Sequence, residues 1–165
     1  MKKKIDIWFL ARAGIIGALY AAITLLVAPI SFGMVQFRLS EALCVLPYYD
    51  KSAIPGLFVG CLVANIVGGN GIWDVVIGSL ATLLAAYLTS LMAKSESKNK
   101  FLFVPMPPVL INGLLVGFML HWVLGTGLLL TILSVSFGEA VVCYILGSGL
   151  MLLIEKNGLF AKKNY

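Results

Sequence analysis

Ionisable and amide side chains stand isolated within long apolar stretches of this sequence. The ionisable ones are Arg38, Glu41, Asp74, His121 and Glu139, and the amides are Asn65, Asn70 and Asn112. Carboxylates accept hydrogen bonds from paired N–H donors, and an asparagine supplies both a donor and an acceptor. Together with the flat faces of Trp73 and Phe137, this set is suited to bind a planar heterocycle with an amidine-like edge, or a cationic amine.

The composition shows what kind of chain carries these groups. Of the 165 residues, 61% are hydrophobic and 12% are charged, and the mean hydropathy is +1.02. Soluble domains are about 45–50% apolar and about 25% charged, so the sequence predicts an all-α integral membrane protein with one domain over residues 1–165. The phosphate-binding pattern G-x-x-x-x-G-K-[ST] is absent. We therefore expect a protein that is not an enzyme and uses no cofactor or metal, with energy supplied by a partner or an ion gradient.

Six apolar runs are candidates for membrane-spanning helices, which need roughly 20 residues each. They cover residues 8–30, 35–49, 53–67, 75–93, 101–124 and 127–154, and the second is short and charged. The two termini and the second and fourth connections hold all ten lysines of the chain, whereas the first, third and fifth connections hold none. Cytoplasmic loops are enriched in Lys and Arg. We therefore predict a compact bundle of six transmembrane helices with both termini in the cytoplasm, and no nucleic-acid partner.

This orientation places most of the polar groups in the outer half of the membrane, as in a vestibule open to the outside. Glu139 and Asn112 lie deeper, about 12 residues or about 18 Å from the outer ends of their helices, and thus near the midplane. A lone carboxylate at that depth needs a partner, a ligand or a proton. We therefore expect a functional role for Glu139.

Other polar residues have structural alternatives. Arg38 and Glu41, three residues apart, can neutralise each other, and Asp74 can stabilise a helix N-terminus. His121 can pack at the membrane interface. The three cysteines lie in apolar stretches without a C-x-x-C pair, so we expect buried, inert thiols at Cys44, Cys61 and Cys143.

Small residues recur at every fourth position in several runs, which lets helix backbones approach closely in lipid. We expect the rows in the third and fourth runs to pack inside the protein. The first run carries two adjacent rows and forms a broad smooth face, which is a candidate docking surface for another protein. The rows are Ala13, Gly17 and Ala21; Gly14, Ala18 and Ala22; Gly56, Gly60, Ala64 and Gly68; and Gly78, Thr82, Ala86 and Ser90.

Three segments resemble the QueT family. They are Arg38-Leu-Ser-Glu-Ala-Leu43, Gly60-Cys-Leu-Val-Ala-Asn65 and Gly71-Ile-Trp-Asp-Val-Val-Ile-Gly-Ser-Leu-Ala-Thr-Leu83. The resemblance extends over nearly the whole chain, from about residue 12 to residue 153. It implies the substrate-binding S component of an energy-coupling-factor (ECF) transporter in the bacterial cell membrane. Such a subunit would capture a queuosine precursor, a 7-deazaguanine such as preQ1 or preQ0, from outside for ATP-driven uptake.

The resemblance also implies partners and roles for particular residues. The partners are a transmembrane coupling protein and two ATP-binding-cassette ATPases, which hydrolyse the ATP. Docking of the coupling protein would use Gly14, Ala18 and Ala22 on the first helix. The candidate substrate-binding residues are Glu139 or Glu41 for the N–H edge of a guanine-like ring, Asn112 or Asn65 for its carbonyl, and around them Arg38, Asn70, Trp73, Asp74 and His121.

Other functional classes stay open at this point. A stand-alone proton-coupled carrier could use Glu139 as a relay, although such carriers often contain an internal repeat, which we do not find. A membrane enzyme could use His121 and Glu139 as an acid–base pair, but the sequence holds no H-E-x-x-H or G-x-S-x-G motif. An S component for another vitamin-like heterocycle is a third alternative.

Overall fold

The structure is a computed structural model that describes residues 6–33, 35–69, 71–93 and 99–159. Helices form its elements, with η marking 3-10 or π segments. In chain order they are α1 (Ile7–Leu26), α2 (Ala28–Ser31), η1 (Leu39–Tyr48), α3 (Ala53–Gly68), η2 (Asp74–Gly78), α4 (Ser79–Met92), α5 (Lys100–Phe103), α6 (Met106–Leu124), α7 (Leu128–Val141), η3 (Val142–Gly147) and α8 (Ser148–Lys156). Each of the six predicted runs coincides with one or more of these elements, so the all-helical prediction is confirmed.

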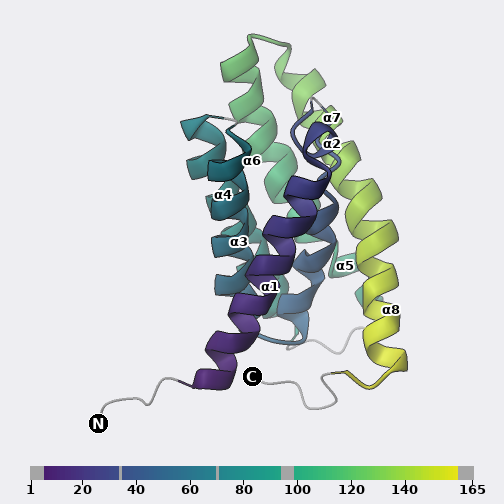
Figure 1. The fold of residues 1–165 in the computed structure, drawn as a ribbon. Coiled ribbons are helices and arrows are strands. Elements are labelled where there is room, and N and C mark those ends of the chain that lie inside the picture. Colours follow the sequence, from purple (N-terminus) through teal and green to yellow (C-terminus); the bar gives the residue numbers. More distant parts are fainter. Residues whose placement is uncertain (1–5, 34, 70, 94–98, 160–165) are drawn as a thin grey trace.

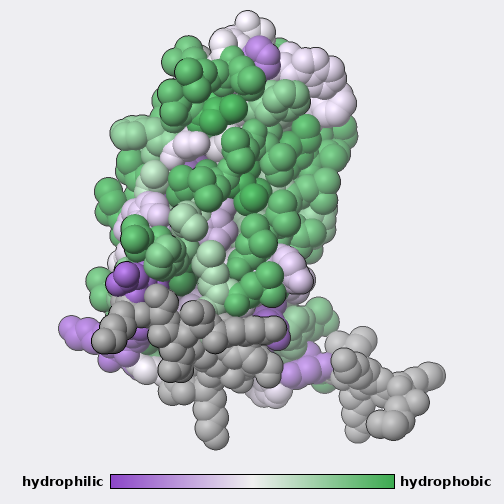
Figure 2. Space-filling view, turned by 180° about the vertical axis from the view of Figure 1, so that it is seen from behind, coloured by the Kyte–Doolittle hydropathy of each residue, from purple (hydrophilic) through white to green (hydrophobic). Residues whose placement is uncertain are grey.

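Among the described residues, four helical segments are long and apolar enough to cross a membrane. They are Ile7–Leu26, Asp74–Met92, Lys100–Leu124 and Leu128–Lys156, while Leu39–Tyr48 and Ala53–Gly68 are shorter apolar helices. Large apolar side chains cover the outside, among them Leu26, Leu129 and Phe137 at 83%, 70% and 62% exposure. Figure 2 shows this apolar surface over most of the body. An apolar exterior of this kind is suited to contact with lipid rather than water. The number of times that the chain crosses the membrane stays a prediction.

The described helices begin and end at the same end of the bundle. The start of α1 and the end of α8 both lie at the lower end in Figure 1, and the α6–α7 turn lies at the opposite end. Two ion pairs join elements at the lower end: Arg12 Nε lies 2.7 Å from Asp50 Oδ2, and Lys100 Nζ lies 2.7 Å from Glu155 Oε1. Strongly hydrophilic residues gather mainly at this end in Figure 2. This arrangement is compatible with the predicted placement of both termini on one side.

The second predicted run differs most from expectation. Instead of a long helix over residues 35–49, the chain is irregular as far as Arg38 and then forms η1, a 10-residue 3-10 helix with Pro47 inside it. Element η1 is largely buried and contacts α1, α3, α4, η3 and α8. A 3-10 helix of this length is uncommon. It is stabilised here because the surrounding helices enclose it.

Small residues bring α1 and α3 into backbone contact. A Cβ atom added to Gly17 would lie 2.8 Å from the Gly56 carbonyl oxygen, and one added to Gly60 would lie 2.6 Å from the Gly17 carbonyl oxygen. The row of small residues in α4 is likewise buried. We predicted that the rows of the third and fourth runs pack inside the protein. This prediction is confirmed for Gly56 and Gly60 of α3 and for the row of α4.

Candidate functional site

A cluster of buried polar side chains lies beside η1, and we call it the polar cluster. Its members come from six parts of the chain, and none is more than 8% exposed. They are Arg38 before η1, Glu41 in η1, Asn65 in α3, Asp74 in η2, Asn112 in α6 and Glu139 in α7. The structure thus brings together six of the nine substrate-binding residues that the sequence suggested.

Arg38 is the cation of the polar cluster. Its Nη2 atom lies 4.0 Å from Asp74 Oδ1, and its Nη1 atom donates to Cys61 Sγ at 3.7 Å. Its guanidinium lies 5.4 Å from the centre of the Phe32 ring, and it also interacts electrostatically with the carboxylates of Glu41 and Glu139. The ion pair is therefore formed with Asp74, and not as a simple pair with Glu41.

The Glu41 carboxylate accepts hydrogen bonds from three donors of the protein itself. The Tyr20 hydroxyl of α1 donates to Oε1, Thr82 Oγ1 of α4 donates to the same atom at 3.2 Å, and Cys44 Sγ donates to Oε2 at 2.8 Å. Three donors on one carboxylate fix its position. This arrangement gives Glu41 a role in holding α1, η1 and α4 together.

The Glu139 carboxylate has weaker support. Cys143 Sγ lies 3.7 Å from Oε2, and the Asn112 amide supplies a side-chain hydrogen bond. Glu139 lies 11 residues after the start of α7, which is about 17 Å along the helix axis. The expected deep carboxylate with an amide beside it is therefore present, and it has more capacity to accept hydrogen bonds than Glu41 has.

Several buried atoms in the polar cluster have no hydrogen-bond partner among the described residues. They are Arg38 Nε and Nη2, Asn65 Oδ1, Asp74 Oδ1 and Asn112 Oδ1. Buried polar atoms are nearly always hydrogen-bonded, so each exception asks for an explanation. Because the polar cluster contains both unpaired donors and unpaired acceptors, it is suited to bind a ligand that carries hydrogen-bond acceptors as well as donors.

Irregular helix geometry accompanies the polar cluster. Asp74 begins the π segment η2, and Cys143 lies in the π segment η3. Such segments are frequent at functional sites. At the end of η2, Gly78 leaves room for its neighbours, because a Cβ atom there would lie 3.1 Å from Asn65 Nδ2 and 3.8 Å from Arg38 Nη1.

Three suggested site residues do not join the polar cluster as described. Trp73 packs edge-on against Trp122 with ring centres 4.9 Å apart, and it is 45% exposed. His121 contacts the Thr126 carbonyl oxygen through Nδ1 at the end of the bundle that carries the α6–α7 turn. Asn70 lies outside the described residues. A substrate contact by any of them stays a prediction.

Some polar neighbours of the cluster were not anticipated. Tyr20 and Thr82 hold Glu41; Thr82 was marked only as a member of a row of small residues, and no spacing in the sequence marks Tyr20. All three cysteines are buried free thiols, as expected, but each one contacts a group of the polar cluster rather than a purely apolar core. Over the part of the chain that the structure describes, no group of His, Cys, Asp and Glu is arranged to hold a metal ion.

Comparison with known proteins identifies the family. The family model for the QueT transporter matches residues 10–156. The chain belongs to the QueT family. A curated relative, "Queuosine precursor transporter QueT" of Lactococcus lactis subsp. cremoris (strain MG1363), is 30% identical over 101 residues, which is 60% of this chain and 59% of the relative. No solved structure matches the chain significantly.

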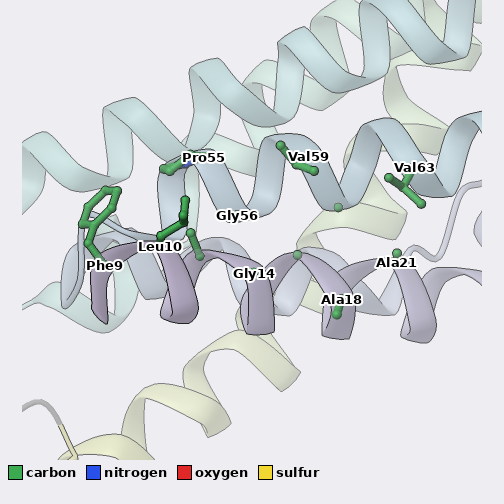
Figure 3. A pocket seen from close by; sticks show the side chains of 12 residues that line it. Phe9, Leu10, Gly14, Ala18, Ala21, Pro55, Gly56, Val59 and Val63 are labelled. Atoms are coloured by element: carbon green, nitrogen blue, oxygen red, sulfur yellow. The ribbon is translucent and has the colours of Figure 1, made fainter. Parts of the chain in front are cut away.

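This QueT family member carries its two rows of small residues on different faces of α1. Ala13, Gly17 and Ala21 are buried and face α3, whereas Gly14, Ala18 and Ala22 are exposed. Beside the exposed row, α1 and α3 line an apolar groove of about 410 Å³. Figure 3 shows the groove between the two helices, with Phe9 and Leu10 near one end and Val59 and Val63 along it.

Proposed function

We propose that this protein is the substrate-binding membrane subunit of an ECF-type importer and captures a queuosine precursor, a 7-deazaguanine such as preQ1 or preQ0. The observation that carries the proposal is the polar cluster: a deep carboxylate beside unpaired donors and acceptors, in a chain of the QueT family. The name of the relative from Lactococcus lactis supports the substrate class.

The chemistry of a guanine-like ring matches this cluster. Its N1–H and exocyclic amine are adjacent donors that one carboxylate accepts together. Glu139 is the better candidate for this contact, because the Glu41 carboxylate is already occupied by three donors. One arginine faces three carboxylates here, so a ligand rich in N–H groups, such as the aminomethyl-bearing preQ1, complements the charge better than an anion does.

The energy for uptake comes, in this proposal, from a transmembrane coupling protein and two ATP-binding-cassette ATPases. The sequence contains no phosphate-binding loop of its own. Six membrane crossings with both termini in the cytoplasm would place the end of the bundle with the α6–α7 turn outside and the lysine-rich connections inside. The exposed row of α1 and the apolar groove beside it provide a smooth surface where the coupling protein would dock.

Binding and transport assays test the two halves of this proposal separately. The purified protein is expected to bind preQ1 or preQ0 and to leave a panel of vitamins unbound; binding of a vitamin instead would move the substrate to another heterocycle. In liposomes, uptake is expected only with the coupling protein, the ATPases and ATP. Robust uptake by this chain alone along a proton gradient would establish the carrier alternative.

A pair of substitutions on α1 tests the docking face. Ala18→Trp adds a bulky side chain to the exposed row, so uptake and co-purification of the coupling protein should be lost while the isolated protein still binds substrate. Gly17→Leu is the matched control, because a Cβ atom there already meets the Gly56 carbonyl oxygen at 2.8 Å; it should abolish folding and binding together. Normal uptake by the Ala18→Trp protein would exclude this surface.

A further inference from the structure

Gln36 has an unusual backbone conformation. Its φ is +47°, and it is the non-glycine residue with positive φ among the residues that the structure describes. Glutamine lacks the short side chain that lets Asn or Asp adopt this region more readily. Two hydrogen bonds hold the conformation: Gln36 N donates to the Gly33 carbonyl oxygen at 3.1 Å, and Arg38 N donates to the Gln36 carbonyl oxygen at 2.9 Å. Conformations of this kind persist where the surroundings enforce them, and they cluster at functional sites.

The segment around Gln36 is pressed against the helix turn that carries Glu139. A Cβ atom added to Gly138 would lie 2.1 Å from the Val35 carbonyl oxygen and 3.0 Å from that of Gln36. Only a glycine at position 138 permits this approach. Gln36 is therefore adjacent to residue 138, one position before Glu139 in the chain.

Burial places the Gln36 side chain on the inner side of its segment. Gln36, Arg38 and Ser40 are buried at 3%, 3% and 0% exposure, whereas the residues between them, Phe37 and Leu39, are partly exposed. Gln36, Arg38 and Ser40 are therefore the inward-facing residues of this irregular stretch and of the start of η1. Arg38, on the same inner face, reaches the polar cluster through its contacts with Cys61 and Asp74.

We propose that Gln36 is a specificity-determining residue whose side-chain amide binds the polar edge of the substrate next to Glu139. The inference rests on the proposed function, since it assigns one more contact to the same site. A carboxylate can only accept hydrogen bonds, so a ring carbonyl adjacent to the N–H donors needs a separate donor. The amide of Gln36 supplies that donor and keeps an acceptor for a neighbouring N–H. The strained backbone is retained because it holds the amide at this position.

The test separates binding from backbone strain, and preQ1 is the probe. Gln36→Gly removes the amide and also relieves the strain, because glycine adopts positive φ without a steric penalty. This gain offsets the greater flexibility of the unfolded glycine chain. The purified variant should keep the Tm of the wild type or exceed it, and its affinity for preQ1 should fall about tenfold. Gln36→Asn, which keeps an amide and tolerates this backbone, should lose less affinity than Gln36→Gly.

Each other outcome is decisive as well. Wild-type affinity in the Gln36→Gly protein would overturn the inference. A joint fall in Tm and affinity in both variants would make Gln36 a structural residue and would overturn it too. Failure of the wild-type protein to bind preQ1 or preQ0 would instead contradict the proposed function, which these measurements therefore test independently.

Discussion

The lower end of the bundle and the polar cluster differ in how closely their oppositely charged side chains approach each other. At the lower end, Asp50 has Arg12 Nε at 2.7 Å and accepts the Ser52 backbone N–H at 2.9 Å, and Glu155 has Lys100 Nζ at 2.7 Å. In the polar cluster, Arg38 and Asp74 are 4.0 Å apart. Among the described residues, both regions contain buried polar atoms without a hydrogen-bond partner, but Arg12 Nε and Asp50 Oδ2 at the lower end are in close ion-pair contact, whereas Arg38 Nη2 and Asp74 Oδ1 are not. Leaving buried polar atoms unpaired costs about 1–3 kcal/mol each. The charged groups of the lower end thus contact each other closely, whereas those of the polar cluster are farther apart, and in the proposed function a ligand would complete their contacts.

The same contrast separates the two buried glutamates. Glu41 accepts from Tyr20, Thr82 and Cys44, while Glu139 has a 3.7 Å contact with Cys143 and the amide of Asn112. Two residues of one chemical type, both at 0–2% exposure, therefore have different hydrogen-bond surroundings. Removing the charge of each one should reveal which role it has.

The largest effect is expected from Glu41→Gln on stability. The new amide group would face hydroxyl and thiol donors in place of an acceptor, and hydrogen bonds to a charged group contribute about 1.5–3 kcal/mol each. The free energy of unfolding should fall by about 3 kcal/mol or more, measured by denaturation of the purified protein. Glu139→Gln serves as the control and should change it by less than about 1 kcal/mol. Equal stability of the two variants would remove the contrast between the glutamates.

The next effect is expected from Glu139→Gln on substrate binding. The side chain keeps its shape and loses its charge, so the protein should fold normally while one charge-assisted hydrogen bond to the substrate is lost. That loss corresponds to about 10- to 150-fold weaker binding of preQ1 or preQ0, measured by calorimetry. Undiminished affinity for both compounds would return Glu139 to a structural role.

The smallest effect is expected at the lower end, from Lys100→Met. Lys100 and Glu155 are 30% and 32% exposed, and an ion pair of this kind contributes about 0–1 kcal/mol and weakens with salt. The variant should lose no more than this in stability, with the difference vanishing at high ionic strength. Its affinity for preQ1 should equal that of the wild type. A reduced affinity would show that the two regions are coupled and not separate.

The sequence predicted those features that depend on spacing along one helix. Rows of small residues four positions apart predicted that α3 packs closely inside the protein, although they did not predict that Gly17 of α1 would be the contact of Gly56 and Gly60. The depth of Glu139 follows from counting residues along an apolar run. The same count placed Glu139 and Asn112 at equal depth, but it did not predict that the Asn112 amide bonds to the Glu139 carboxylate.

Features that depend on how helices are rotated about each other could not be predicted. Whether Glu41 would pair with Arg38 or be held by Tyr20 and Thr82 is decided by three helices from different parts of the chain. The 3-10 geometry of η1 was missed because hydropathy alone does not distinguish a buried short helix from a membrane span. Gln36 gives no signal in the sequence, since its significance lies in a backbone angle.

Element η1 is made early in the chain but enclosed by its last part. Cys143 contacts the Glu41 carbonyl oxygen across 102 residues, and Tyr49 bonds to Glu155 across 106. A ribosome adding about 5–20 residues per second needs about 5–20 s to make the segment between these partners. Throughout that interval the Glu41 carboxylate is without the elements α7, η3 and α8. Its donors Tyr20, Cys44 and Thr82 are all synthesised before those elements, so during biogenesis the first half of the chain alone supplies the hydrogen bonds of this carboxylate.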